Sequence, residues 1–282
     1  MDSITRRDLL SRAGRIGAAL GIGLPGVNTT GKTQPDSQVS TGRKLKVIVA
    51  GGHPGDPEYG CGGTIARYAD LGHEVVLLYL NNGEWPPAQG GASANVRMGE
   101  AGKACEILKA RPLYAGQSNG HAVLDASHFD EFRKILEAEH PDVVITQWPI
   151  DHHRDHRATC ALAFDAWLRM GKKFALYYYE VSNGEDTLQF SPTHYVDITE
   201  REPRKRSACY AHASQTPDRF YDLQDQVARF RGVESGYKRA EAYVLQVQSP
   251  YQALPAALIC LGAQSFASSR VSISGPMRKG RV

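Results

Sequence analysis

The sequence predicts an α/β fold of the Rossmann-like kind, an open, mostly parallel sheet with helices on both faces. Short apolar runs alternate with helical patterns from Lys44 onward, which is the punctuation of βαβ units. The runs are almost continuously apolar, as expected for parallel strands buried on both faces. Gly72 follows the first helical pattern at a capping position. A chain of 282 residues is long enough for one such domain and its core.

Each element follows from its own pattern. Strands are predicted at 45–50, 75–80, 112–115, 143–146 and 174–179, and helices between and after them at 61–71, 96–110, 128–140 and 158–170. Beyond Thr193 the sequence predicts one more strand at 194–198 and helices at 200–211 and 218–232. We assign 44–262 to this domain. The Ser/Gly/Arg-rich stretch 263–282 has no periodicity and is predicted to be a flexible tail.

The N-terminal segment has the pattern of an export signal. Arg6 and Arg7 precede Leu9 and a modestly apolar, glycine-rich stretch at 13–27, and a polar linker follows at 28–42. This resembles a twin-arginine signal, which is an address rather than an anchor. An amphipathic helix that starts with two arginines is the alternative. We expect 1–43 to be signal and linker, and the protein to be periplasmic or extracellular with no transmembrane anchor, because the stretch is too short and glycine-rich to span a membrane.

Charge and cysteine content exclude two classes of protein. The formal net charge is +3, but outside 1–43 the chain has 27 basic and 27 acidic residues. The sequence therefore shows no electrostatic footprint of nucleic-acid binding. Its five cysteines are widely spaced, which excludes a C-x-x-C metal knuckle and argues against a disulfide framework.

Two polar loops follow predicted strands one and four. Strand one leads into Gly51-Gly52-His53-Pro54-Gly55-Asp56, and strand four into Asp151-His152-His153-Arg154-Asp155-His156. Ligands of open α/β sheets bind beyond the carboxyl ends of strands at the switch point. With strand order 3-2-1-4, strands one and four are neighbours, so the two loops should face one crevice. Turn residues that are merely solvated are the alternative for either loop alone.

The residue types in these loops are those of a catalytic metal site. Imidazole and carboxylate with no cysteine are typical of catalytic zinc, which keeps an open position. His153 and His156 are three apart and would share a helix face, so one could coordinate the metal while the other moves protons. His152 would point elsewhere.

At these residues the sequence resembles the PIG-L/LmbE family of zinc-dependent N-deacetylases. The family's first motif, His-Pro-Asp-Asp-Glu and then Gly-x-Gly-Gly-Thr, is matched by His53, Pro54, Asp56, Gly60, Gly62, Gly63 and Thr64. Its second motif is matched by His153, Asp155, His156 and Arg157. Weaker likeness is found at Arg97 and Glu100, at His212, Ser214 and Gln215, and at 240–243. The likeness spans about residues 45 to 245.

The resemblance implies one Zn²⁺ ion per chain, held by His53, Asp56 and His156, and a catalytic role for His153. Asp155 would orient a histidine through a hydrogen bond.

The resemblance also implies that Arg97 contacts the substrate; an exposed helical ion pair with Glu100 is the alternative. His212 and Gln215 would contact the substrate or support residues of the site.

One departure from the motif bears on the chemistry. The family has an aspartate general base at the position of Gly55, and the following glutamate is Pro57 here. His153 could take the proton of the attacking water, with Asp155, Asp151 or Glu58 as alternatives. A weakened or non-catalytic relative is the competing interpretation.

The resemblance, together with the export signal, implies an N-acetylated sugar or glycoconjugate as substrate, hydrolysed at its linear amide; another amide is an alternative. Trp85, Trp148 and the tyrosines at 177–179 could stack on sugar rings. The tyrosines lie in a predicted strand, where packing is the commoner role, so Trp85 is the better candidate. The sequence leaves the oligomeric state open.

Overall fold

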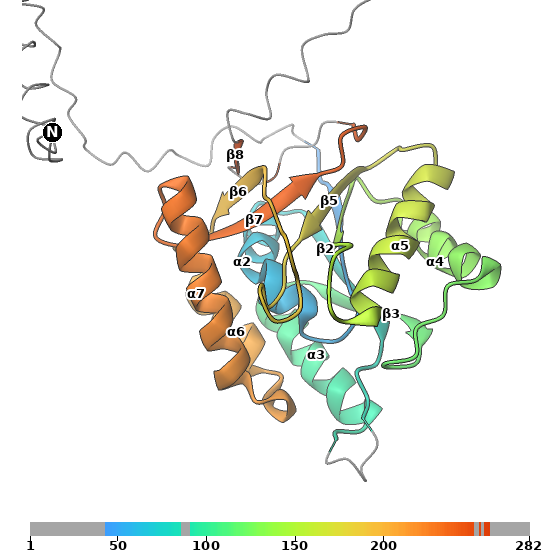
Figure 1. Cartoon of the computed structure of the whole chain (residues 1–282), viewed down its shortest axis with the longest axis horizontal. Helices are drawn as coiled ribbons and strands as arrows, with labels where there is room; N and C mark the ends of the chain where they lie inside the picture. The colour runs from blue at the N-terminus through green and yellow to red at the C-terminus, as the bar shows by residue number, and fades with distance from the viewer. Residues whose placement is uncertain (1–42, 86–90, 251–253, 255–256, 260–282) are drawn as a thin grey trace, which may run out of the picture. The chain divides into compact units, whose positions relative to one another are not determined.

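A computed structural model describes residues 43–85, 91–250, 254 and 257–259. The expected signal segment, apart from Arg43, and the expected tail at 263–282 lie outside the described residues. The described part contains a mixed sheet with strand order β3-β2-β1-β4-β5-β7-β6-β8 (Figure 1). This matches the predicted α/β class and the predicted order of the first four strands.

The strands form a parallel half and an antiparallel half. The parallel strands are β1 (Lys46–Gly51), β2 (Glu74–Asn81), β3 (Arg111–Gln117), β4 (Val143–Gln147) and β5 (Ala175–Tyr179). The antiparallel strands are β7 (Ala240–Leu245), β6 (His194–Asp197) and β8 (Ala257–Ile259). The parallel half supplies the carboxyl-end edge where a ligand site is expected.

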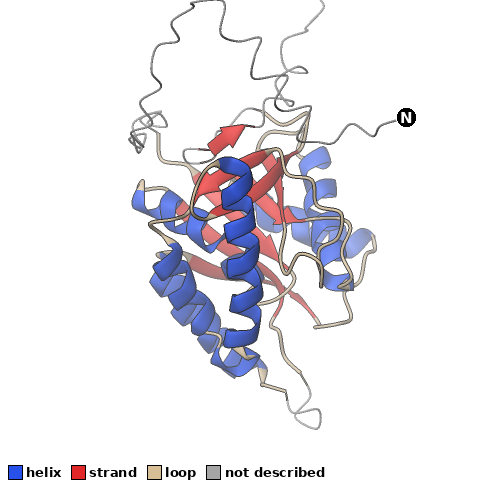
Figure 2. Cartoon of the chain, turned by 60° about the vertical axis from the view of Figure 1, so that its left-hand side comes forward, coloured by secondary structure: helices blue, strands red, loops and turns tan. Residues whose placement is uncertain are grey.

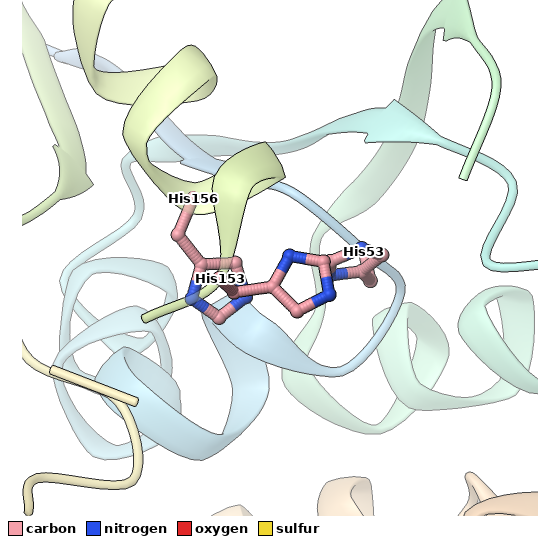
Figure 3. A group of neighbouring side chains, drawn as sticks. All are labelled: His53, His153 and His156. Atoms are coloured by element: carbon pink, nitrogen blue, oxygen red, sulfur yellow. The ribbon is translucent and has the colours of Figure 1, made fainter. Parts of the chain in front are cut away.

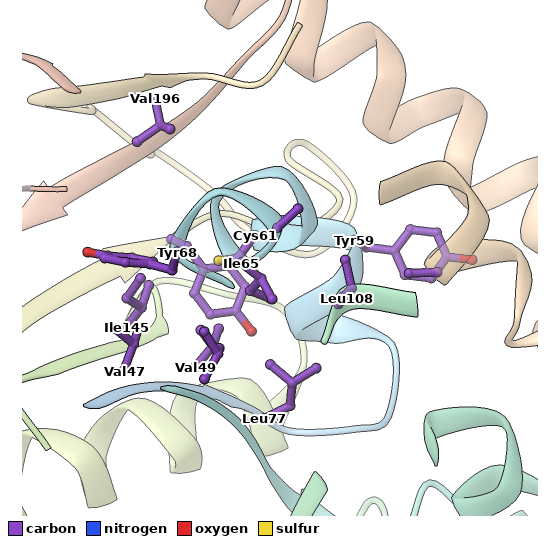
Figure 4. Close-up of a cluster of buried hydrophobic side chains, with 14 of the residues drawn as sticks. Val47, Val49, Tyr59, Cys61, Ile65, Tyr68, Leu77, Leu108, Ile145 and Val196 are labelled. Carbon is purple, nitrogen blue, oxygen red and sulfur yellow. The ribbon is translucent and has the colours of Figure 1, made fainter. Parts of the chain in front are cut away.

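Helices cover both faces of the sheet, as Figure 2 shows. They are α2 (Asp56–Asp70), α3 (Ala94–Leu108), α4 (Ala126–Glu139), α5 (Arg154–Arg169), α6 (Glu202–Tyr210) and α7 (Pro217–Ser235), with a short 3₁₀ helix, η2, at Ala213–Gln215. Successive side chains of a strand point to opposite faces of the sheet, so the hydrophobic core has two parts, one on each face. Val47 and Val49 of β1 face the cluster that contains Ile65 of α2 (Figure 4), whereas Ile48 faces the cluster that contains Leu162 of α5.

The structure corrects the predicted elements at particular places. Helix α2 begins at Asp56 and α5 at Arg154, four or five residues before the predicted starts. Both loops are therefore shorter than expected, and their polar residues lie in first helical turns. Strands β7 and β8 were not predicted: β7 has the charged residue Glu241 within a short apolar run, and β8 has only three residues. No helix in the described ranges is long and apolar enough to cross a membrane.

Candidate metal centre

The two polar loops lie side by side because β1 pairs with β4 in parallel register. Gln147, the last residue of β4, joins them: it accepts a hydrogen bond from Gly52 N at 2.9 Å and donates one to Asp56 Oδ2 at 3.0 Å. Gly52 must be small here, since a Cβ would lie 3.0 Å from Cδ2 of His156. The expected juxtaposition of the loops is thus present.

His53, Asp56 and His156 face one another across a single carboxylate oxygen. Asp56 Oδ2 lies 3.2 Å from His53 Nδ1 and 3.2 Å from His156 Nε2. The backbone N of His53 also donates to this oxygen at 2.8 Å. Two imidazole nitrogens and a carboxylate oxygen in this arrangement fit the donor chemistry of a divalent transition metal.

Each of these imidazoles is held from behind by a buried carboxylate. Asp155 Oδ2 lies 3.1 Å from His53 Nε2, and Asp151 Oδ1 lies 3.1 Å from His156 Nδ1. Both carboxylate side chains have no solvent exposure. A carboxylate on the second ring nitrogen fixes the tautomer and orientation of metal-binding histidines. Asp155 therefore touches a histidine, as expected, and that histidine is His53.

The two supporting carboxylates are themselves fixed. Asp155 accepts hydrogen bonds from Asn81 Nδ2 at 3.1 Å and from the backbone N of Gly120 at 2.7 Å. Asp151 accepts from the backbone N of His153 at 2.7 Å and from Thr187 Oγ1 at 3.1 Å. Their oxygens are engaged by the protein, so they position other groups.

His153 completes a cluster of three imidazoles at the N-terminus of α5 (Figure 3). Its ring centroid lies 4.5 Å from that of His53 and 4.7 Å from that of His156. One ligand atom from each histidine lies within 4.8 Å of the others. Two sets of three metal ligands are therefore possible. Both contain His53 and His156, and the third ligand is either Asp56 or His153. His153 caps the helix instead of lying in it, and its Nδ1 accepts the backbone N–H of Asp155 at 3.2 Å.

Charges in the cluster are strongly coupled. Burial alone would raise the pKa of Asp56, but His156 and His53 hold it well below its usual range. Burial would lower the pKa of His156, but Asp56 and Asp151 raise it to about 10. Burial, together with His53 and His156, lowers the pKa of His153 to about 4. Without a metal the two imidazoles beside Asp56 therefore bind protons that a cation would displace.

A cavity of about 200 Å³ opens over this cluster. The candidate metal residues and His153 line it together with the three residues expected at the substrate: Arg97, His212 and Gln215. The tyrosines at 177–179 are buried in β5 instead. Trp148 packs edge-on against Tyr178 and Phe190.

Arg97 is buried and bound by the protein. Its guanidinium donates to Pro54 O at 2.6 Å and to Gly83 O at 3.2 Å, and it pairs with Glu100 at 3.1 Å. The pair with Glu100 was an expected alternative, but it is buried, with only 3% of the Arg97 side chain exposed. Arg97 thus ties α3 to the loop between His53 and Asp56.

His212 pairs with another buried carboxylate. Its Nε2 lies 3.0 Å from Glu58 Oε1, which also accepts from the hydroxyl of Tyr79 at 2.7 Å, and both His212 and Glu58 are fully buried. The second oxygen of Glu58 accepts the N–H of Gly55 at 3.2 Å. Nδ1 of His212 has no partner in the described part of the chain.

Three residues of the site were missed by the sequence analysis. Gln147 and Asn81 end β4 and β2, and a polar side chain at the end of an apolar strand could have indicated both. Asp186 lines the cavity from the segment between β5 and β6, where no sequence pattern connects it to the two motifs.

Known proteins resemble this chain over the region that carries the site. Residues 47–167 match the family model described as PIG-L: GlcNAc-PI de-N-acetylase. Diacetylchitobiose deacetylase from Thermococcus kodakarensis is 26% identical over 219 residues, which cover 70% of this chain and 81% of that protein.

Two solved structures show the same fold. The N,N′-diacetylchitobiose deacetylase of Pyrococcus horikoshii is 24% identical with a TM-score of 0.62, over 72% of this chain and 84% of that one. The 4-carboxy-2-hydroxymuconate hydratase GalB of Pseudomonas putida is 22% identical with a TM-score of 0.61, over 72% and 95%. One fold thus carries two reactions, and activity has to be argued from the site.

The matched segment contains both loops, and the strand order β2-β1-β4 brings them together. Over the segment that carries both loops, the chain is therefore similar to the PIG-L/LmbE-like family.

Proposed function

We propose that this protein is a metal-dependent N-deacetylase that hydrolyses the linear amide of an N-acetylated sugar or glycoconjugate. The observation that carries the proposal is the arrangement of His53, Asp56 and His156 around one carboxylate oxygen, with a buried carboxylate behind each imidazole. We propose one Zn²⁺ ion per chain at these residues. A divalent cation there would polarise the acetamide carbonyl and lower the pKa of a water molecule to about 7.

His153 is placed to donate a hydrogen bond to the acyl oxygen. Since its Nδ1 accepts the N–H of Asp155, the proton of the neutral ring is on Nε2. The lowered pKa of His153 keeps the ring neutral at pH 7. A neutral imidazole with a fixed N–H can stabilise a developing oxyanion. This role suits the geometry better than accepting the proton of water.

Aromatic side chains around the cavity support a sugar substrate. Tyr59, Trp85 and Phe220 line it, and Trp85 is 47% exposed. Exposed aromatic faces provide flat apolar surface on which sugar rings can pack. The diacetylchitobiose deacetylase of Thermococcus kodakarensis, an enzyme named for a sugar substrate, is a relative of this chain.

The test is acetate release from a panel of N-acetylated sugars by the zinc-loaded protein. We expect turnover that is lost on chelation, and lost with bound metal in Asp56→Asn. Glu185→Gln is the matched control, because Glu185 is an exposed acid paired with Arg219. Glycan binding without acetate release would favour a non-catalytic relative, and acetate from non-sugar amides alone would change the substrate class.

We also propose that the protein is exported by the twin-arginine route and acts in the periplasm or outside the cell, with 1–43 as signal and linker. The pair Arg6 and Arg7 ahead of a glycine-rich apolar stretch supports this. Fusing 1–43 to a reporter that is active only after folded export should give signal, and Arg6→Lys with Arg7→Lys should abolish it. Unchanged export of the double variant would contradict the proposal.

A further inference from the structure

The carboxylates closest to the metal residues already accept hydrogen bonds from other groups of the protein. Asp151 and Asp155 each hold a histidine, and Glu58 accepts three hydrogen bonds. A carboxylate that must take a proton during turnover needs an oxygen that is free to face water. None of these three offers one, so the function of the aspartate missing at Gly55 has to come from another group.

Asp186 meets this requirement. Asp56 and Asp186 are the only carboxylates among the described residues that line the cavity. The Asp186 side chain has no hydrogen-bond donor or ion-pair partner within the described ranges, and the residue is partly exposed. Its carboxylate is thus open to the water of the cavity over the metal residues.

The backbone holds Asp186 next to the second polar loop. Its N–H donates to Ser182 O at 2.9 Å, and its carbonyl accepts the N–H of His152 at 2.9 Å. The adjacent Thr187 bridges to Asp151, both through the backbone and through its hydroxyl. The turn that carries Asp186 is therefore fastened to the residues that position His156.

The electrostatic surroundings suit a proton acceptor. Burial raises the pKa of Asp186; His156 opposes this rise, and the negative charges of Asp56, Asp151 and Glu185 add to it. A carboxylate with a raised pKa is a stronger base than an exposed one.

We propose that Asp186 is the proton acceptor for the attacking water, in place of the carboxylate missing at Gly55. This inference rests on the proposed deacetylase function. Water gives one proton to the Asp186 carboxylate as its oxygen bonds to the acyl carbon. When the C–N bond breaks, that proton passes to the leaving nitrogen, so the products are acetic acid and the free amine, and the acid then ionises to acetate by releasing its proton to solvent.

His212 is the competing acceptor, because its Nδ1 has no partner among the described residues and its ring lies 3.8 Å from where a Cβ of residue 55 would be. Its side chain is fully buried, however, whereas Asp186 is open to water. The pair of His212 and Glu58 also fixes the N–H of Gly55, which is a structural role.

The experiment compares the zinc-loaded wild type with Asp186→Asn, Asp186→Ala and His212→Gln, and with Asp222→Asn as the control, because Asp222 is an exposed acid on α7 that accepts a hydrogen bond from Gln226 of the same helix. A positioned base contributes about 10²–10⁴-fold, so we expect kcat for acetate release to fall by at least about 100-fold in both Asp186 variants, with KM and bound zinc near wild-type values. Added formate should restore part of the rate of acetate release in Asp186→Ala and leave the rate of Asp222→Asn unchanged.

The outcomes separate the inference from the proposed function. An active wild type with full turnover in Asp186→Asn would overturn the role of Asp186 and leave the deacetylase intact. Loss of turnover in His212→Gln, with zinc retained and Asp186→Asn active, would move the role to His212. A zinc-loaded wild type that releases no acetate from any acetamide would overturn both.

Discussion

At residue 55 the backbone has a φ of +113°, a conformation that L side chains rarely adopt. Space is not the constraint, because an added Cβ would meet Tyr59 at an ordinary 3.5 Å. The backbone conformation at this position therefore disfavours the aspartate that the PIG-L/LmbE-like family carries there. Restoring it by Gly55→Asp would strain this turn, so that variant cannot report on the chemistry alone.

The strain gives a stability prediction. Gly55→Ala should lower the free energy of unfolding of the metal-free protein by about 1–3 kcal/mol, the cost of a strained backbone position. Urea denaturation measures this. Gly99→Ala makes the same change on the exposed face of α3, with nothing near the new Cβ, and should stabilise by up to about 1 kcal/mol. Equal effects of the two substitutions would contradict the strain.

The protonated imidazoles give a prediction about metal binding. Since the pKa of His156 is raised to about 10, its ring is protonated on both nitrogens at pH 7 without a metal, and the raised pKa of His53 also favours the protonated form of that ring. Zinc binding must displace these protons, so affinity should rise with pH up to about the pKa of His156.

Calorimetry in buffers of different ionisation enthalpy should find at least about one proton released per ion at pH 7, from His156, with a further contribution from His53. His152→Gln, a change at an exposed histidine of the same loop, should release as many. A proton count of zero would exclude His53 and His156 as ligands.

At the scale of elements, Arg97 joins α3, the end of β2 and the loop that bears Pro54. Arg97→Lys removes the planar set of donors that reaches these carbonyls at once. We expect a loss of about 1–3 kcal/mol in unfolding free energy and weaker zinc binding, because Pro54 lies between two of the proposed ligands, His53 and Asp56.

Denaturation and a zinc titration check this, and Arg229→Lys is the control. Arg229 is 62% exposed in an ion pair on α7, where the change should cost less than about 0.5 kcal/mol. A raised KM with unchanged stability would instead assign Arg97 to the substrate.

The same scale shows what the sequence could predict. The apolar runs identified the five parallel strands, and strand order then brought His53 and His156 together. The helix starts were wrong because Asp56 and Asp155 lie inside first turns, where acidic residues are stabilised by the helix dipole.

Contacts between distant segments were beyond sequence reasoning. The supporting role of Asp151 depends on Thr187, 36 residues later, and the position of Asp186 depends on a turn without regular structure. Neither contact leaves a periodic pattern or a fixed spacing in the sequence. Hence the sequence could indicate His53, Asp56 and His156 as candidate ligands and Asp155 as an orienting group, whereas it could not indicate the contacts that hold Asp151 and Asp186 in place.

At the scale of the whole molecule, the antiparallel strand β7 is hydrogen-bonded to helix α2. Glu241 of β7 accepts the backbone N–H groups of Gly63 and Thr64 at 2.8 Å and pairs with Lys205 at 2.7 Å. The side chains of Glu241 and Lys205 are each only 2% exposed. Removing one partner of a buried ion pair costs about 3–5 kcal/mol. Helix α2, which begins at Asp56, is therefore anchored by residues far beyond the matched segment 47–167.

This dependence predicts that the matched segment does not fold alone. A chain of residues 44–170 keeps both polar loops but loses β5, which covers the outer edge of β4. It also loses Lys205 and Glu241, and leaves the buried carboxylate of Glu58 without His212. Since each loss exposes apolar surface or leaves a buried polar group without its partner, we expect the losses together to be comparable with the 5–15 kcal/mol that stabilises a typical domain. Residues 43–259 should unfold in one cooperative urea transition. The short chain 44–170 should show no such transition and should not bind zinc in a defined site. A cooperative transition of the short chain would contradict the anchoring by β7.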